Sequence, residues 1–260
     1  MGLMALGTVW TGGWPFAALW LAAGIAVAAE WMAMTCPGSA RPLTLAASAG
    51  LAGLALAHIT GVSGTYILAV GAIFGIILGL VAASSRDRGW ALAGFVYSAA
   101  IVLVPILLRA HPGFGAEAIL WMFAVVWTTD IAAYFVGRAI GGPKLWPAVS
   151  PGKTWSGFAG GLLGGTLAGC GIVAATAPEG SVLRAGLPAI VAASAIASVA
   201  SQGGDLAESA MKRLFGVKDS GRLIPGHGGV MDRLDGFAAV TLLVGLAFLT
   251  ASLAGRAGLS

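Results

Sequence analysis

Residues 201–235 form a polar stretch in an otherwise apolar sequence. Five of the ten acidic residues lie in it, namely Asp205, Glu208, Asp219, Asp232 and Asp235. Five of the fourteen basic residues also lie in it, namely Lys212, Arg213, Lys218, Arg222 and Arg233. Carboxylates without nearby cysteine suit a hard cation such as Mg²⁺, and basic residues and glycines suit phosphates. The stretch therefore predicts phosphoryl or nucleotidyl transfer. The alternative is a solvated loop with internal salt bridges.

The rest of the chain must hold this stretch at a membrane. The sequence is 58% hydrophobic and 9% charged, where soluble domains carry roughly 25% charged residues. Because a crossing helix needs about 20 apolar residues, we expect an all-α, polytopic membrane protein of about eight helices (seven to nine). The expected segments are 14–34, 43–59, 64–83, 91–108, 117–137, 157–176, 187–203 and 236–254. We expect a single membrane domain over 1–260, with N-terminal helices to about 115, a catalytic part over about 116–254 and a signature loop over 203–235.

The distribution of basic residues orients these segments. Eleven of the fourteen fall in the loops on one side, and Arg109, Arg184 and Arg256 fall on the other. Basic residues favour the cytoplasmic side, so we expect the polar stretch to face the cytoplasm, at the inner membrane of a bacterium. The N-terminus has no basic region, and we interpret it as a first membrane segment rather than a cleaved signal. Cys36 and Cys170 have no motif spacing, so we expect apolar fillers.

Three polar residues lie within predicted membrane segments. Glu30 either reaches the interface or has a buried role, and His58 is expected to be interfacial. Asp130 lies deeper, where a charge normally faces a cavity or a partner. It shares one helix face with Tyr134, Gly137 and Arg138. This face either lines the active cavity or forms a structural ion pair.

Two further features concern phosphate binding and helix ends. The loop 141–157 is rich in Gly, Pro and Lys, which suits phosphate oxygens, although an ordinary basic loop fits equally and the P-loop pattern is absent. In the polar stretch, we expect the helix to break at Gly203-Gly204. If it resumes there, Asp205, Glu208 and Lys212 share one face, and Gly216 ends the helix. The acidic groups around Asp205 and Asp232, 27 residues apart, are then expected to meet across a loop.

The polar stretch resembles the signature of the phosphatidate cytidylyltransferases, also called CDP-diacylglycerol synthases. That signature reads S-x-x-K-R-x-x-x-x-K-D-x-x-x-x-x-P-G-H-G-G-x-x-D-R-x-D. Its fixed positions are all present, as Ser209, Lys212, Arg213, Lys218, Asp219, Pro225, Gly226, His227, Gly228, Gly229, Asp232, Arg233 and Asp235. Three upstream blocks also match, carried by Trp127, Asp130, Ala133, Tyr134, Gly137 and Arg138, by Ser150, Pro151, Lys153, Thr154 and Gly157, and by Gly204, Asp205, Glu208 and Ser209. The resemblance is close over about 120–240.

The resemblance implies transfer of cytidylyl from CTP to phosphatidate, giving CDP-diacylglycerol and pyrophosphate. It implies Mg²⁺, with a second cation in some arrangements, and metal ligands Asp205, Asp232 and Glu208. Implied catalytic residues are Lys212, Arg213, Lys218, Asp219, His227 and Asp235. Implied substrate-binding residues are Asp130, Tyr134, Arg138, Lys144, Ser150, Lys153, Thr154, Ser209, Gly228, Gly229 and Arg233. The implied partners are CTP, phosphatidate and membrane lipids, with no nucleic acid, and a homodimer is compatible with the family.

The sequence departs from the family pattern in two places. Ser156 stands where an acidic residue is frequent, and the N-terminus is short beside members that begin with a basic residue. Three other functions were considered. A different CTP-using membrane enzyme, with a polyprenol or another lipid as acceptor, would keep the nucleotide chemistry. A CDP-alcohol phosphotransferase would need a D-G-x-x-A-R pattern, which is absent. An ion or solute transporter would favour charges near the bilayer midplane, whereas these cluster at one face.

Overall fold

The chain folds into two compact units. Unit 1 consists of Met1–Ala110 and Leu214–Leu234, and unit 2 consists of His111–Arg213 and Asp235–Ser260. The computed structural model describes residues 2–62, 64–176, 186–226 and 228–256. The polar stretch thus contributes to both units.

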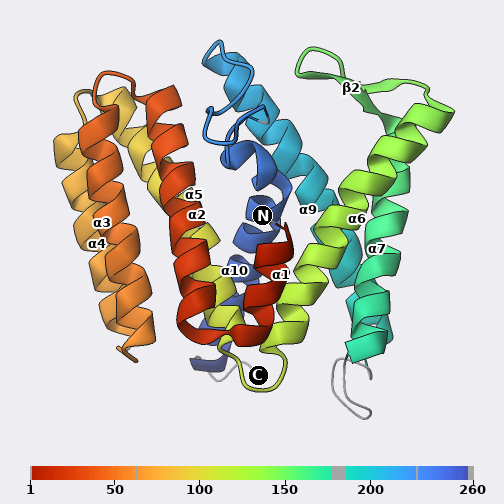
Figure 1. Ribbon diagram of the computed structural model, residues 1–260, viewed down its shortest axis with the longest axis horizontal. Helices are drawn as coiled ribbons and strands as arrows, with labels where there is room; N and C mark the ends of the chain where they lie inside the picture. Colours follow the sequence, from red (N-terminus) through yellow and green to blue (C-terminus); the bar gives the residue numbers. More distant parts are fainter. Residues whose placement is uncertain (1, 63, 177–185, 227, 257–260) are drawn as a thin grey trace. The chain divides into compact units, whose positions relative to one another are not determined.

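Unit 1 is a group of apolar N-terminal helices, drawn in red to yellow in Figure 1, together with a later segment drawn in blue. Its elements are α1 (Gly2–Thr11), α2 (Gly13–Thr35), α3 (Ala40–Ile59), α4 (Gly64–Val81), α5 (Ser85–Arg109) and the 3-10 turn η1 (Met231–Arg233). Glycines bring α2 and α5 together, since a Cβ on Gly24 would lie 2.2 Å from Val102 and one on Gly94 would lie 2.3 Å from Trp31. The Trp31 indole also donates to the Trp90 carbonyl oxygen at 2.8 Å. Small residues at such contacts let membrane helices approach closely.

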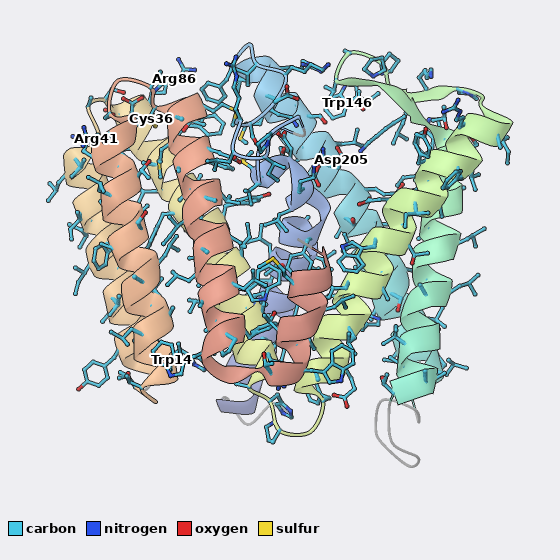
Figure 2. The ribbon with its side chains drawn as sticks, in the orientation of Figure 1. Trp14, Cys36, Arg41, Arg86, Trp146 and Asp205 are labelled. Carbon is cyan, nitrogen blue, oxygen red and sulfur yellow. The ribbon has the colours of Figure 1, made fainter. Side chains whose placement is uncertain are left out.

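The two ends of unit 1 carry different side chains. Arg41 and Arg86 lie at one end and Trp14 lies at the other (Figure 2). Arg109 lies near the Trp14 end, where its Nε donates to the Val9 carbonyl oxygen at 2.7 Å. This bond holds the short helix α1, whose 10 residues are too few to span a membrane. Within unit 1, Arg41 and Arg86 therefore lie at the end opposite Arg109, as predicted from the alternation of loops between the two sides.

Unit 2 contains the remaining long helices and a small hairpin. Its elements are α6 (Gly115–Ile140), β1 (Lys144–Trp146), β2 (Ser150–Thr154), α7 (Trp155–Thr176), α9 (Leu187–Leu214, whose last residue is counted in unit 1) and α10 (Asp235–Arg256). The strands pair antiparallel, with Lys144 opposite Thr154 and Trp146 opposite Ser150. Figure 1 shows α6 and α7 side by side, joined by the hairpin.

A glycine stripe on α7 allows close packing against α6. Gly157, Gly161, Gly165 and Gly169 recur every four residues and are buried. A Cβ on Gly165 would lie 2.1 Å from Thr129 Oγ1 and 3.1 Å from Ser198 Oγ. Hydrogen bonds then fix α9: Thr129 donates to Ser198 at 2.8 Å, and Ser198 donates to the Gly161 carbonyl oxygen at 3.2 Å. Helices α6 and α7 therefore hold the middle of α9 in place.

The helical architecture confirms the predicted fold class. Among the described residues, six helices (α2, α3, α5, α6, α7 and α9) are long and apolar enough to cross a membrane. Shorter apolar helices cover Tyr66–Val81 and Asp235–Thr250, so the count agrees with about eight segments. The chain is an integral membrane protein.

Two local predictions were wrong. Helix α9 continues through Gly203-Gly204 to Leu214 without a break. The reason is packing: a Cβ on Gly204 would lie 2.8 Å from the Asp235 carbonyl oxygen at the start of α10, so this glycine permits a helix contact. The expected loop 141–157 also contains the hairpin β1–β2, whose strands of three and five residues are too short to show a pattern.

Candidate functional site

A cavity of about 540 Å³ that is lined by several charged side chains opens in unit 2. Helix α6, the hairpin, α7 and α9 all contribute to its lining. Seven predicted site residues line it, namely Asp130, Tyr134, Arg138, Lys144, Lys153, Thr154 and Asp205. Trp146 of the hairpin and Asp205 lie toward the same end of unit 2 (Figure 2). Residues separated by up to 75 positions are therefore brought together as the motifs predicted.

An ion pair joins the hairpin to α9 inside this cavity. Lys153 Nζ lies 2.5 Å from Asp205 Oδ2, and the two side chains are 27% and 35% exposed. The hairpin is held in turn by Thr154, whose Oγ1 accepts from the Gly157 amide at 3.1 Å. This bond caps the start of α7 and places Lys153 at the cavity wall.

The predicted face of α6 is also confirmed. Asp130, Tyr134, Gly137 and Arg138 all line the cavity, and Arg138 Nη1 donates to the Tyr134 hydroxyl at 2.9 Å. Asp130 of α6 and Asp205 of α9 both line this cavity, whereas Asp235 is not part of its lining. Asp235 begins α10 and accepts from the Gly236 amide at 2.8 Å. The cavity therefore combines carboxylates with basic side chains, as binding of a cation and a phosphate requires.

The C-terminal turns of α9 carry a second ion pair. Lys212 Nζ lies 3.1 Å from Glu208 Oε1, four residues earlier on the helix. The Glu208 side chain is only 3% exposed and that of Lys212 is 13% exposed. One turn earlier, Ser209 Oγ donates to Asp205 at 3.4 Å. Because α9 is continuous, Asp205, Glu208 and Lys212 share one helix face, as predicted. Arg213 lies beside this face and is exposed.

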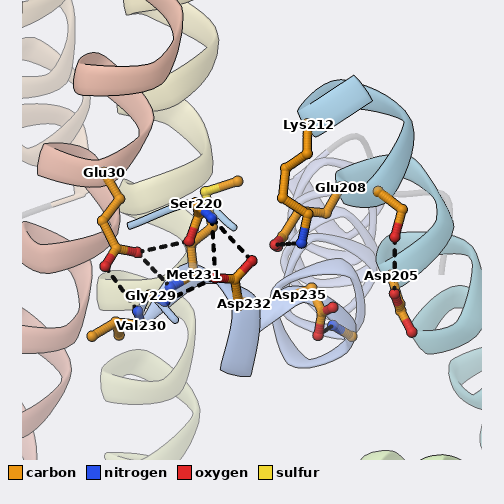
Figure 3. A network of polar contacts seen from close by, with 12 residues as sticks. Glu30, Asp205, Glu208, Lys212, Ser220, Gly229, Val230, Met231, Asp232 and Asp235 are labelled. Atoms are coloured by element: carbon orange, nitrogen blue, oxygen red, sulfur yellow. Dashed lines mark hydrogen bonds and ion pairs between the residues drawn. The ribbon is translucent and has the colours of Figure 1, made fainter. Parts of the chain in front are cut away.

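Unit 1 contains the other half of the signature, organised by a buried glutamate of α2. Glu30 is 4% exposed. Its Oε1 accepts from the Val230 amide at 2.9 Å. Its Oε2 accepts from the Met231 amide at 2.8 Å and from Ser220 Oγ at 3.1 Å. Figure 3 shows the carboxylate facing these three donors. The suggestion that Glu30 reaches the membrane interface is therefore wrong.

The Asp232 carboxylate accepts hydrogen bonds from backbone amides of the same loop that donates to Glu30. Its Oδ2 accepts from the Gly229 amide at 2.8 Å and from the Ser220 amide at 3.0 Å, and the Ser220 amide also lies 3.2 Å from Oδ1. Gly228 has a φ of +81°, and a Cβ there would lie 2.7 Å from Asp232 Oδ2. The loop thus needs glycine at this position, both for its backbone conformation and for space.

The remaining signature residues of unit 1 are accessible. The signature residues Lys218, Asp219 and Arg233 are exposed, as is Arg222 between them. The part of the polar stretch that belongs to unit 1 begins by packing on α5. Its Phe215 ring lies 5.7 Å from the Arg86 guanidinium and 5.0 Å from the Trp90 ring. Ser150 begins β2 and does not line the cavity, and the predicted residue His227 lies outside the described residues.

The predicted metal ligands belong to both units. Asp205 and Glu208 lie in unit 2, and Asp232 lies in unit 1. Among the described residues, no three His, Cys, Asp or Glu side chains are grouped so as to hold a metal ion. The donor chemistry nevertheless fits Mg²⁺, because all three are carboxylates and Mg²⁺ is bound through oxygen.

Sequence reasoning underestimated Glu30 and missed Ser220. The available signal was a lone carboxylate inside an apolar segment, which by default indicates a specific partner. The partner is a hydroxyl and two amides located 190 to 201 residues later. No local pattern reports a contact over that separation.

Comparison with known proteins agrees with this site. The sequence model of the family described as "Cytidylyltransferase family" matches residues 1–251. A phosphatidate cytidylyltransferase of Brucella suis is 47% identical over 179 residues, which cover 68% of this chain and 64% of the relative. One of Staphylococcus epidermidis is 44% identical over 133 residues, which cover 51% of this chain and 49% of the relative. The matches thus span less than two thirds of these relatives. Since the family model covers nearly the whole sequence, the chain belongs to the cytidylyltransferase family.

Proposed function

We propose that this chain is a phosphatidate cytidylyltransferase. It would transfer cytidylyl from CTP to phosphatidate, giving CDP-diacylglycerol and pyrophosphate for phospholipid synthesis. The observation that carries the proposal is the unit 2 cavity, where Asp130, Lys153 and Asp205 meet at one end of membrane-length helices. The printed name of the relatives supports the same reaction.

The reaction is a single displacement at phosphorus. An oxygen of the lipid phosphate forms a bond to the α-phosphorus of CTP, and the bond from that phosphorus to the bridging oxygen of the β-phosphate breaks. Pyrophosphate leaves with the electron pair. Because the lipid phosphate is itself a nucleophile, alignment is the main requirement and no covalent enzyme intermediate is needed.

The basic residues would bind the phosphates. Arg138, Lys144 and Lys153 line the cavity, where their charges would hold phosphate oxygens. Lys212, Arg213 and Lys218 are assigned by the signature to the triphosphate or to the lipid phosphate. Asp219 would position Lys218 or accept from the nucleoside.

Mg²⁺ is proposed on the same signature, with Asp205, Asp232 and Glu208 as ligands and Asp235 as a further candidate for a second cation. The carboxylates of Asp130 and Asp205, which both line the cavity, support a bound cation. When bound, the cation would neutralise negative charge on the triphosphate.

The proposed location follows from charge and substrate solubility. Eleven of the fourteen basic residues fall in loops on one side of the segments predicted from the sequence, which favours the cytoplasmic side. CTP is water-soluble, whereas the acyl chains of phosphatidate stay in the bilayer. We therefore propose an inner-membrane enzyme with its site facing the cytoplasm, and a homodimer stays a prediction.

The test is pyrophosphate release by purified protein in detergent with CTP, phosphatidate and Mg²⁺. The variants are Asp205→Asn and Asp232→Asn. Asp87→Asn is the matched control, because Asp87 lies in the first turn of α5, outside the signature. We expect release to need all three components, to fall by about 10²-fold or more in both signature variants and to persist in the control.

Other outcomes separate the rival functions. Release only with another lipid phosphate, such as a polyprenol phosphate, would keep the nucleotide chemistry and reject phosphatidate as acceptor. A folded wild-type protein without release on any lipid phosphate would overturn the proposal, and transport would then be measured in vesicles.

A further inference from the structure

We infer that Glu30 of α2 is a positioning residue for Asp232, so that the N-terminal helices hold part of the catalytic signature in its working geometry. This inference rests on the proposed function, in which Asp232 binds the metal. The upstream motifs and the signature do not include Glu30.

The surroundings of Glu30 select a carboxylate. Its two oxygens accept from three donors, which are two backbone amides and one hydroxyl. A carboxylate offers only acceptors, whereas a glutamine amide must direct N–H groups from one of its two ends. Glutamine at this position would therefore turn a donor toward at least one of these donors. The donors around Glu30 therefore fit both the charge and the shape of a carboxylate.

Ser220 links Glu30 to Asp232. The Ser220 hydroxyl donates to Glu30 while the Ser220 amide donates to both oxygens of Asp232. The serine is 6% exposed, so water does not substitute easily for either bond. A displacement of Ser220 by loss of the Glu30 contact would move the amide that orients the Asp232 carboxylate.

Residues 229–231 form a second link. The Gly229 amide donates to Asp232, and the next two amides donate to Glu30. A Cβ on Gly229 would lie 2.4 Å from Glu30 Oε2 and 2.2 Å from Ser220 Oγ. One tight segment thus turns its first amide to Asp232 and its next two to the buried glutamate (Figure 3).

The consequence is indirect control of the proposed metal ligand. Glu30 has no role as a ligand here, because its oxygens face the loop. It acts through the hydrogen bonds that fix where the Asp232 oxygens point. Outer partners of this kind typically change metal affinity or activity by about 10–100-fold when they are mutated.

The test compares metal binding as well as activity. Mn²⁺ is titrated into purified wild type, Glu30→Gln, Glu30→Asp and Asp232→Asn in detergent, and free Mn²⁺ is followed by electron paramagnetic resonance. Glu117→Gln is the matched control, because Glu117 lies in the first turn of α6 and outside the network. Thermal unfolding of each variant gives the folded fraction.

We expect Glu30→Gln to weaken Mn²⁺ binding by about 10–100-fold, approaching Asp232→Asn, while the control binds like wild type. Glu30→Asp keeps the charge on a shorter side chain, so its affinity should fall between wild type and Glu30→Gln. Ser220→Ala removes only the hydroxyl link, and combined with Glu30→Gln its effect should be less than additive.

Several results would overturn the inference. One is unchanged Mn²⁺ affinity in folded Glu30→Gln. Another is a loss that merely follows the unfolded fraction, and if Glu30→Gln does not fold, the same comparison applies to Glu30→Asp and Ser220→Ala. Wild type that binds Mn²⁺ but releases no pyrophosphate would reject the proposed function alone, because the binding comparison still decides the role of Glu30. Wild type that binds no Mn²⁺ would overturn the inference directly.

Discussion

Lys153 of strand β2 and Asp205 of helix α9 form an ion pair at 2.5 Å in the wall of the unit 2 cavity. Two motifs that are 52 residues apart in sequence therefore meet in one place. Both side chains are partly exposed, and exposed pairs contribute only about 0–1 kcal/mol to stability. The pair is therefore expected to contribute little to folding, which is compatible with the proposed roles of both side chains in binding.

Replacement of Lys153 by methionine should separate these two roles. We expect a change of at most about 1 kcal/mol in the free energy of unfolding. Pyrophosphate release should fall by about 10²-fold or more, because a cation facing the reacting phosphates is lost. The control is Arg88→Met, an exposed basic residue in the first turn of α5. Equal losses of activity in both variants would contradict the assignment of Lys153.

Gly165→Ala tests the packing of α7 on α6. The added Cβ would lie 2.1 Å from Thr129 Oγ1, so the helices must separate. Overpacking of this kind costs about 1–3 kcal/mol, and we expect a lower midpoint of thermal unfolding in detergent. Gly171→Ala on the same helix is the matched control, because nothing lies within 4 Å of its Cβ. A variant at Gly165 as stable as this control would disprove the contact.

The bond from Thr129 to Ser198 provides a measurable link between α6 and α9. Both side chains are fully buried, and their oxygens are 2.8 Å apart. A double-mutant cycle with Thr129→Val and Ser198→Ala should give a coupling of about 0.6 kcal/mol, and at most about 1.7 kcal/mol, as found for hydrogen bonds between membrane helices. The measurement is unfolding in mixed micelles. Strict additivity of the two single effects would mean that the bond contributes nothing.

Cys36 should react slowly with alkylating reagents. Burial raises the pKa of its thiol above the ordinary value of 9.0, and only the thiolate is an effective nucleophile. Because the folded pKa is raised, the thiolate fraction at pH 8 is smaller in the folded than in the unfolded protein. We expect iodoacetamide labelling of Cys36 at pH 8, followed by mass spectrometry, to be slower in the folded than in the unfolded protein. The same protein denatured in dodecyl sulfate is the control, and equal rates in both states would refute the burial argument.

The helices were predictable because each is a long apolar run, which needs no knowledge of its neighbours. The cavity face of α6 was predictable for a similar reason, since Asp130, Tyr134 and Arg138 follow helical spacing. The continuation of α9 was not, because Gly204 is tolerated only through its contact with α10. The hairpin escaped detection because its strands are very short.

The partners of charged groups were the least predictable feature. Lys153 was correctly assigned to the site, but its pairing with Asp205 depends on how a hairpin and a helix are placed in space. Glu30 depends on donors at the other end of the chain. Spacing identifies which residues share an element, whereas these contacts depend on the packing of elements far apart in sequence.

The separation between Glu30 and Ser220 also has a consequence for biogenesis. The carboxylate is synthesised 190 residues before the hydroxyl that donates to it. At about 5–20 residues per second, that interval is about 10–40 s. During this time the nascent N-terminal helices must hold an acidic side chain without its final hydrogen-bond donors. Unit 1 can therefore finish folding only after the ribosome has delivered the C-terminal part of the chain, which makes its maturation a post-insertion event.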